Sequence, residues 1–165
     1  DYYASRGLGD VYKRQPKDNS ITLDPQSYQG ASITATATAC HEVGHACQYA
    51  QGYMPMKVRG AMVPVVNFAS NTWIFLLLIG IFLNVAGLVD LAIIFYAFAV
   101  LFQIVTLPVE FDASKRALVY MSTTGLPAGE RSGAWNVLRA CALTYVAAAL
   151  ISVMQLVYLL GSREE

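Results

Sequence analysis

The chain has 165 residues, of which 56% are hydrophobic and only 13% are charged, and its formal net charge at pH 7 is zero. About a quarter of an average soluble domain is charged, so this composition is typical of a membrane protein. A neutral chain has no basic surface to neutralise phosphates, and we therefore expect membrane lipid, and no nucleic acid, among its partners.

Three cysteines, Cys40, Cys47 and Cys141, form no C-x-x-C pair and leave one thiol over in any disulfide scheme. Reduced thiols facing the cytosol are the simplest interpretation. Cys40 and Cys47 flank the motif described below and could bind a metal, although packing as small apolar residues is the favoured role.

The first fifteen residues differ in character from the rest. The stretch from Ser5 to Gln15 resembles, residue for residue, the translation of a transposase adapter used in making sequencing libraries. We therefore leave residues 1–15 out of fold reasoning and expect residues 5–15 to pack poorly. The natural sequence is expected to begin near Pro16, so that residues 16–165 form one N-terminally truncated domain. A genuine polar arm is the alternative.

The natural part opens with a short β-prone run over residues 19–23, which Asp24 and Pro25 close. Such a strand could bind an extended peptide at its edge, or it could be an ordinary turn arm. From Ser27 to Tyr53, the Ala and Thr content and the absence of Pro predict one long helix.

That helix carries the pattern H-E-x-x-H, from His41 to His45, and these are the only two histidines in the chain. Residues four apart project from the same helix face, so both imidazoles can bind one zinc ion. Glu42 lies beside them as a candidate general base for a water that zinc makes acidic. The alternative is a partly buried helix whose histidines bond to backbone or water.

Three apolar segments follow. Residues 68–86, 91–107 and 140–160 are each close to the 20 apolar residues that cross a bilayer, and Asp90 could be the N-cap of the second. Pro108 is expected to end or kink that second span. Together with the motif helix, they predict an all-α membrane protein with three transmembrane helices and one short strand near 19–23.

The basic residues next to these spans indicate a topology. They fall on one side of the predicted membrane, and the 84–90 hairpin carries none; they are Lys57, Arg59, Lys115, Arg116, Arg131 and Arg139. By the positive-inside rule, the motif and residues 108–138 face the cytoplasm together, in what we expect to be a bacterial plasma membrane.

Catalytic zinc usually has three protein ligands and one open position. With no third histidine, a carboxylate must serve, and the candidates after the motif are Asp90, Glu110, Asp112, Glu130, Glu164 and Glu165. Asp90 is on the wrong face of the membrane by the topology argument, whereas Glu110 is on the right face. Asp112 could serve instead, but a residue two positions along a helix points elsewhere.

The segments from His41 to Gln48 and from Val109 to Ala117 resemble the YugP-type family of neutral zinc metallopeptidases of membranes. The resemblance extends over essentially everything from Pro16 onward. More distantly, the chain is similar to HtpX-type membrane proteases, whose second motif begins with a zinc-binding glutamate and has an aspartate four residues later. The resemblance implies that Glu110 is the ligand, that Ser114 replaces the aspartate, and that a further membrane helix precedes Pro16.

The sequence therefore predicts a zinc endopeptidase acting on protein or peptide substrates, with His41, His45 and Glu110 holding Zn²⁺ and Glu42 as the general base. The alternative is a zinc-binding membrane protein without hydrolytic activity, such as a sensor or scaffold. A transporter is a weaker third interpretation, because the predicted spans contain no charged residue. Arg116 and Tyr120 are possible oxyanion donors. The oligomeric state is left open.

Overall fold

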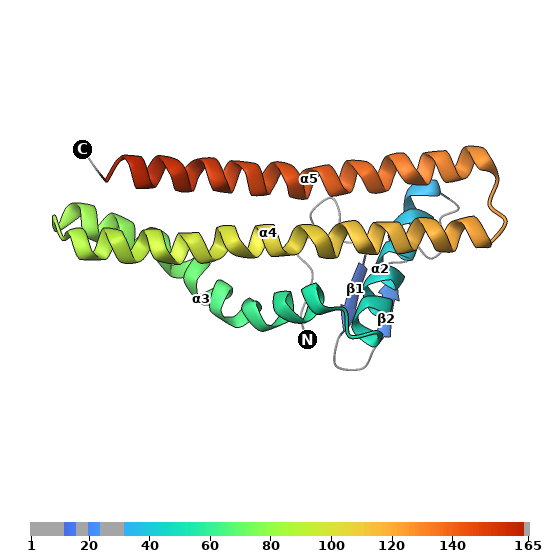
Figure 1. Cartoon of the computed structure of the whole chain (residues 1–165), viewed down its shortest axis with the longest axis horizontal. Helices are drawn as coiled ribbons and strands as arrows, with labels where there is room; N and C mark the ends of the chain where they lie inside the picture. The colour runs from blue at the N-terminus through green and yellow to red at the C-terminus, as the bar shows by residue number, and fades with distance from the viewer. Residues whose placement is uncertain (1–11, 16–19, 24–31, 164–165) are drawn as a thin grey trace. The chain divides into compact units, whose positions relative to one another are not determined.

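The computed structural model describes residues 12–15, 20–23 and 32–163. Two short strands, β1 (Tyr12–Gln15) and β2 (Ser20–Leu23), precede the helices. The helices are α2 (Ile33–Ala50), α3 (Met54–Phe82), α4 (Ala86–Thr123) and α5 (Ala128–Gly161), as Figure 1 shows. This confirms the predicted all-α class with one strand close to residues 19–23.

The chain divides into two compact units, which are described separately. The first comprises residues Asp1–Gln51 and Phe111–Ala142, and the second comprises Gly52–Glu110 and Leu143–Glu165. Helix α4 passes from the second unit into the first without a break in its helical structure.

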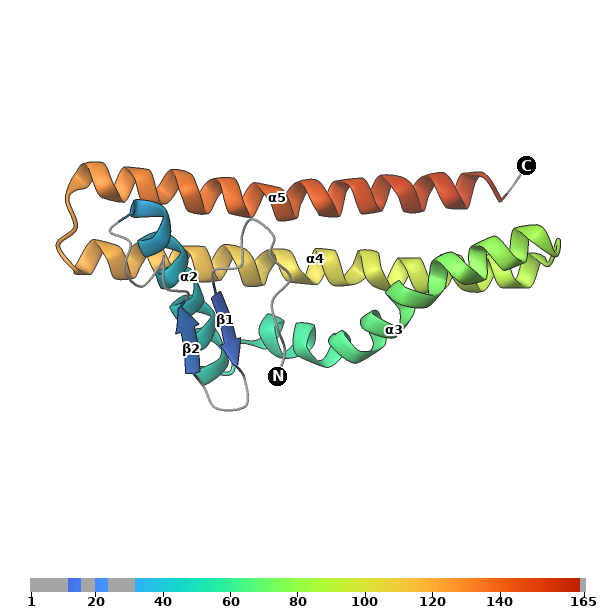
Figure 2. The same ribbon diagram turned by 180° about the vertical axis from the view of Figure 1, so that it is seen from behind.

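In the first unit, β1 and β2 pair antiparallel and lie beside α2 (Figure 2). The helical core combines small residues with two large ones, so that α2 and the segments of α4 and α5 in this unit can approach closely. Its members are Ala37, Cys40, Ala117, Met121, Ala134 and Leu138.

Strand β1 falls within residues 5–15, for which we expected poor packing. For residues 12–15 that expectation is wrong, because they form four paired positions with β2, from Tyr12 opposite Leu23 to Gln15 opposite Ser20. Residues 5–11 lie outside the described part of the chain, and the adapter origin of the whole segment stays a prediction.

In the second unit, α3 packs against α4 through aromatic pairs. The rings of Trp73 and Tyr96 are 4.6 Å apart, and those of Phe68 and Phe95 are 5.8 Å apart. The Tyr96 hydroxyl donates to Oε1 of Gln155 on α5 at 3.1 Å. These contacts connect the three helices of this unit.

The turn between α3 and α4 corrects two predicted boundaries. Asn84 adopts φ +55, and the Val85 and Asn84 amides donate to the Gly80 and Ile81 carbonyls at 2.8 and 3.2 Å. This is a Schellman motif, which ends α3 at Phe82 instead of residue 86, because asparagine tolerates the left-handed conformation. Helix α4 then begins at Ala86, so the prediction that Asp90 is an N-cap is wrong.

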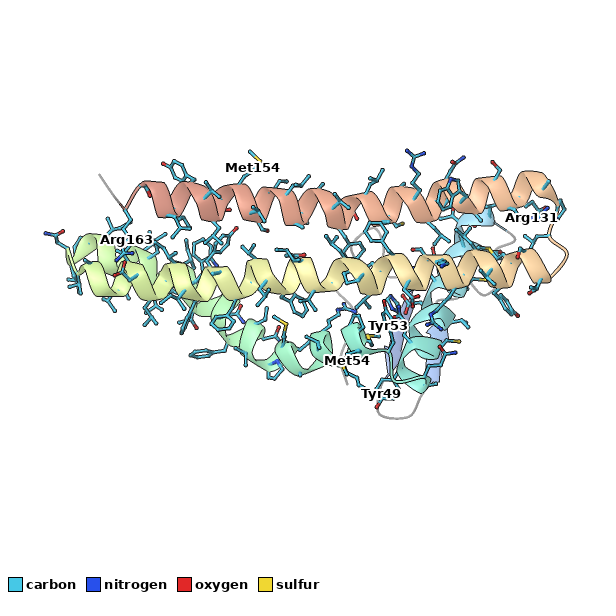
Figure 3. All side chains as sticks on the ribbon, viewed as in Figure 1. Tyr49, Tyr53, Met54, Arg131, Met154 and Arg163 are labelled. Carbon is cyan, nitrogen blue, oxygen red and sulfur yellow. The ribbon has the colours of Figure 1, made fainter. Side chains whose placement is uncertain are left out.

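Asp90 instead pairs with Arg163 of α5, at 2.7 Å from Oδ1 to Nε and 2.9 Å from Oδ2 to Nη2. This bidentate geometry joins the start of α4 to the end of α5 within the second unit. Figure 3 shows Arg163 at that end, and it shows Met154 on the side of α5 that points away from α4.

We expected Pro108 to end or kink the second span, but it does not end α4, and Glu110 lies inside the same helix. A helix-interior proline removes one amide donor and crowds the carbonyl four residues earlier. Burial of one face of the following turns compensates for this cost, since Val109, Ala113 and Ala117, spaced by four, are almost completely buried. Pro64 likewise lies inside α3.

The motif helix is shorter than the predicted 27–53. Ser32 caps it, and its hydroxyl accepts from the Ala35 amide at 3.1 Å. Residues 27–31 lie outside the described residues. At the other end, Gly52 adopts φ +66, which ends α2 before the predicted Tyr53.

Three helices, α3, α4 and α5, are long and apolar enough to cross a membrane by length and composition. Helices α4 and α5 contain the predicted spans 91–107 and 140–160, whereas α3 begins before the predicted span 68–86 and ends at Phe82, four residues short of it. Their outer faces carry exposed large apolar side chains, including Phe75, Phe82, Ile151 and Met154. Such faces are suited to contact with lipid acyl chains.

Candidate metal centre

The candidate metal centre comprises His41 and His45 from α2 and Glu110 from α4. Each of the three side chains offers a ligand atom, and these atoms lie within 4.8 Å of one another. Glu110 directly precedes Phe111 in the unbroken α4 helix, whose next turns pack against α2. The predicted pair of histidines and the predicted third ligand are thus brought together, and Glu42 occupies the neighbouring position on α2.

The close approach of α2 and α4 depends on Gly44, inside the motif. A Cβ added at Gly44 would lie 2.6 Å from the backbone oxygen of Ala113. No real side chain accommodates such a distance from a backbone atom, so the two helix backbones can meet here only because this position is glycine.

His45 is oriented by two polar residues. Nδ1 of His45 lies 2.9 Å from Oε1 of Gln48, while Nε2 of Gln48 donates to Oδ2 of Asp112 at 2.9 Å. An ionised carboxylate only accepts, so the Gln48 amide must present its oxygen to the imidazole. Nδ1 therefore carries the proton, and Nε2 of His45 is left with a lone pair for a metal.

His41 has a corresponding partner in Ser114, whose Oγ lies 3.2 Å from Nδ1 of the imidazole. The contact occupies Nδ1 and leaves Nε2 as the ligand atom, as for His45. Ser114 thus contacts the candidate ligand His41 from the position at which the HtpX-type motif has an aspartate. A hydroxyl can orient the ring but brings no negative charge.

Asp112 supports Gln48 and contacts no histidine itself. Burial tends to raise the pKa of Asp112, but hydrogen bonds from Arg116 and Gln48 and the charges of Arg116 and Lys115 outweigh it and lower the pKa below its usual value. Asp112 lies beyond the predicted span 91–107, and it remains ionised near neutral pH. Its carboxylate can therefore accept the hydrogen bond from Nε2 of Gln48 near neutral pH.

Arg116, one of the two possible oxyanion donors, forms hydrogen bonds with Asp112 and Gln51. Its Nε donates to Asp112 at 2.6 Å and its Nη1 to Oε1 of Gln51 at 2.6 Å. The other, Tyr120, is 54% exposed on α4. Neither arrangement favours a role at the metal centre.

Among the described residues, the remaining candidate ligands are not part of the group. Cys40 belongs to the hydrophobic core, and burial raises the pKa of its thiol, which disfavours the thiolate that metals bind. Asp90 pairs with Arg163, and Glu130 is exposed in the first turn of α5. Glu164 and Glu165 lie outside the described residues.

Gln48 and Asp112 are the supporting residues that the sequence analysis did not identify as such. The available signal was spacing, because Gln48 is three residues after His45 and so shares its helix face. The partner of Gln48 could not be identified in this way, since Asp112 is 64 positions away in the sequence.

The close contact at Gly44 predicts a large effect of Gly44→Ala. The new methyl group must push α2 away from α4, so we expect destabilisation by about 1 to 3 kcal/mol, as for overpacking, together with weaker metal binding. Thermal unfolding in detergent and metal titration would measure both. Gly60→Ala is the matched control, because a Cβ there meets nothing within 4 Å. Equal stability of the two variants would contradict this account of the helix contact.

The hydrogen bonds of Gln48 predict that Gln48→Leu weakens zinc binding by about 10-fold to 100-fold, since His45 loses the partner that fixes its tautomer. Gln51→Leu is the control, because it removes a similar amide that contacts Arg116 and no histidine. Zinc affinity measured by competition with a chelating dye would compare them. If both variants bound zinc equally well, the proposed orientation of His45 would be wrong.

Comparison with known proteins bears on the chemistry. A family model described as "Putative neutral zinc metallopeptidase" matches residues 4–163. The "Putative membrane protease YugP" of Bacillus subtilis (strain 168) is 44% identical over 142 residues, which are 86% of this chain. The chain covers 63% of that relative's length. No solved structure matches the chain. Because the family model extends over nearly the whole sequence, the chain belongs to this family of neutral zinc metallopeptidases.

Proposed function

We propose that this protein is a zinc-dependent endopeptidase that hydrolyses peptide bonds of membrane or membrane-adjacent proteins. The observation that carries the proposal is the convergence of His41, His45 and Glu110, whose ligand atoms lie within 4.8 Å of one another. Two imidazoles and one carboxylate are a common ligand set of catalytic zinc, and they leave one position open.

The surroundings of the three proposed ligands, and not only their residue types, are suited to zinc. The Nδ1 atoms of both histidines have side-chain partners, and Glu110 is only 3% exposed. A buried carboxylate requires positive charge nearby, and a zinc ion would add to the charge that Arg59 provides 3.8 Å from Glu110. We propose that Nε2 of His41, Nε2 of His45 and the Glu110 carboxylate hold the ion.

Glu42 is the proposed general base. It is neighbour to His41 in the sequence and partly exposed, so that it can contact both water and substrate. When bound, zinc supplies a water of lowered pKa and a Lewis acid for the scissile carbonyl. Glu42 accepts a proton from the attacking water and later passes that proton to the leaving amine.

The test uses the full-length protein, with its natural front, in detergent or liposomes. Incubation with an unfolded membrane protein should give cleavage, which a zinc chelator should abolish and added zinc should restore. If the protein binds about one zinc per chain but cleaves nothing, the non-catalytic zinc-binding interpretation replaces this proposal.

We also propose that the metal centre faces the cytoplasm, on the basis of the basic residues that flank the spans. A reporter inserted at Gly125, in the turn before α5, should lie in the cytoplasm, whereas one at Asn84, between α3 and α4, should lie outside. Both reporters in the same compartment would contradict the predicted hairpin.

A further inference from the structure

Arg59 of α3 lies beside the buried Glu110 carboxylate, and no role has yet been given to it. Its Nη1 is 3.8 Å from Oε1 of Glu110. The Arg59 side chain is 30% exposed, whereas that of Glu110 is 3% exposed. The cation is therefore accessible from outside while it contacts a proposed metal ligand.

Thr106 of α4 is a further hydrogen-bond donor, one helical turn before Glu110. Thr106 is 3% exposed, and its Oγ1 has no hydrogen-bond partner among the described residues. Phe102, Thr106 and Glu110 follow one another at spacings of four and share one face of α4. The Arg59 guanidinium lies 6.0 Å from the centre of the Phe102 ring, a distance at which a cation and an aromatic face attract.

This arrangement has unused capacity to bind a negative charge. A guanidinium has five N–H donors, and the one ion pair that Arg59 makes among the described residues, at 3.8 Å from Glu110, leaves most of them available for a substrate. A buried hydroxyl without a partner costs stability, and such groups call for a specific explanation such as a missing ligand. Arg59 contacts Glu110, and Thr106 precedes Glu110 by one turn on the same face of α4.

We propose that Arg59, together with Thr106 one turn before Glu110, stabilises the negative charge that develops on the carbonyl oxygen of the scissile peptide bond. This inference rests on the proposed peptidase function. It assigns the substrate-binding part of the site, for which the sequence named only Arg116 and Tyr120.

The chemistry of the step is balanced without a co-reactant. The water oxygen forms a bond to the carbonyl carbon, the π pair of the carbonyl moves to its oxygen, and the proton of the water goes to Glu42. When the pair returns, the bond from carbon to nitrogen breaks and the amine takes that proton. Arg59 donates hydrogen bonds in both steps and exchanges no proton, because arginine stays protonated in proteins.

A different role for Arg59 would be recognition of the C-terminal carboxylate of a peptide, as an exopeptidase requires. That carboxylate lies one residue beyond the scissile carbonyl, and consecutive Cα atoms are about 3.8 Å apart. Because Arg59 contacts the proposed metal ligand Glu110 itself, we place its donors next to the carbonyl that the metal would polarise and not one residue farther. The geometry therefore favours the oxyanion.

The test compares Arg59→Gln, Arg59→Lys and Thr106→Val with Lys57→Gln in the full-length protein. Lys57 is an exposed cation on α3 two residues before Arg59, which makes it a matched control. Three quantities are measured for each variant: zinc content, cleavage rate, and affinity for a phosphinic peptide, whose tetrahedral anionic centre mimics the developing charge. The same affinity is also measured for the uncleaved substrate peptide in the Glu42→Gln background.

We expect Arg59→Gln to retain zinc, to lose about 100-fold in cleavage rate, and to bind the phosphinic peptide at least 10-fold more weakly. Its affinity for the uncleaved peptide should change by less than about threefold, because an oxyanion donor acts mainly in the transition state. Arg59→Lys should recover part of the loss, Thr106→Val should show a smaller loss, and Lys57→Gln should match the parent.

Other outcomes would overturn the inference. Equal phosphinic affinity in the parent and Arg59→Gln would show that Arg59 is not an oxyanion donor, while cleavage by the parent would leave the peptidase function intact. Effects confined to substrates with a free C-terminal carboxylate, absent from their amides, would assign carboxylate recognition instead. If the zinc-loaded parent neither cleaved peptides nor bound the phosphinic peptide, the proposed function itself would fail.

Discussion

Replacing Glu42 by glutamine should lower proteolysis by about a hundredfold or more while the protein retains its zinc. The amide preserves the size and shape of the side chain but cannot accept a proton from water, and loss of a general base typically costs two to four orders of magnitude. Glu42 is not in the group of ligand atoms formed by His41, His45 and Glu110. Metal affinity should therefore change little.

The measurement pairs metal analysis with a cleavage assay on the same preparations of parent and variant. Asp90→Asn is a suitable control, since Asp90 pairs with Arg163 in the turn region and not with the metal centre. Loss of zinc together with activity in Glu42→Gln would mean that this glutamate is a ligand or a structural residue. Unchanged activity would remove the proposed general base.

The second large effect is expected from Glu110→Gln, which should weaken zinc binding itself. A neutral amide is a poor replacement for a carboxylate ligand. The loss should exceed the roughly 10-fold to 100-fold effect typical of residues that only orient ligands. Asp112→Asn falls into that weaker class, because Asp112 bonds to Gln48 and Arg116.

Zinc titrations of the two variants decide between the carboxylates that the sequence left open. If Glu110→Gln held zinc as tightly as the parent while Asp112→Asn lost it, Asp112 would be the ligand. Activity alone would not separate these cases, because both substitutions are expected to reduce it.

The metal centre was largely predictable because its first half is local. His41, Glu42 and His45 form one turn of helix, and helix periodicity alone places the two imidazoles on the same face. Glu110 could be selected from the charge pattern around the spans and from the family resemblance. The supporting bonds from Gln48 to Asp112 and from Ser114 to His41 required the packing of α2 on α4, which depends on Gly44.

Helix boundaries were less predictable, and the reasons are specific. Counting apolar residues placed the end of the first span at residue 86, but Asn84 in the left-handed conformation ends α3 at Phe82. Pro108 suggested a helix end, but the buried residues of the following turns keep α4 continuous. At Pro108, tertiary packing therefore outweighs the tendency of proline to end a helix. At Asn84, the geometry of the turn sets the end of α3, which counting apolar residues does not reveal.

The central claim is that two histidines and one carboxylate hold zinc, and X-ray absorption at the zinc edge of the full-length protein tests it most directly. We predict nitrogen and oxygen neighbours at about 2.0 to 2.2 Å, with the scattering pattern of two imidazoles, and no sulfur neighbour. A sulfur neighbour at about 2.3 Å would place Cys40 or Cys47 on the metal and contradict the assignment of His41, His45 and Glu110.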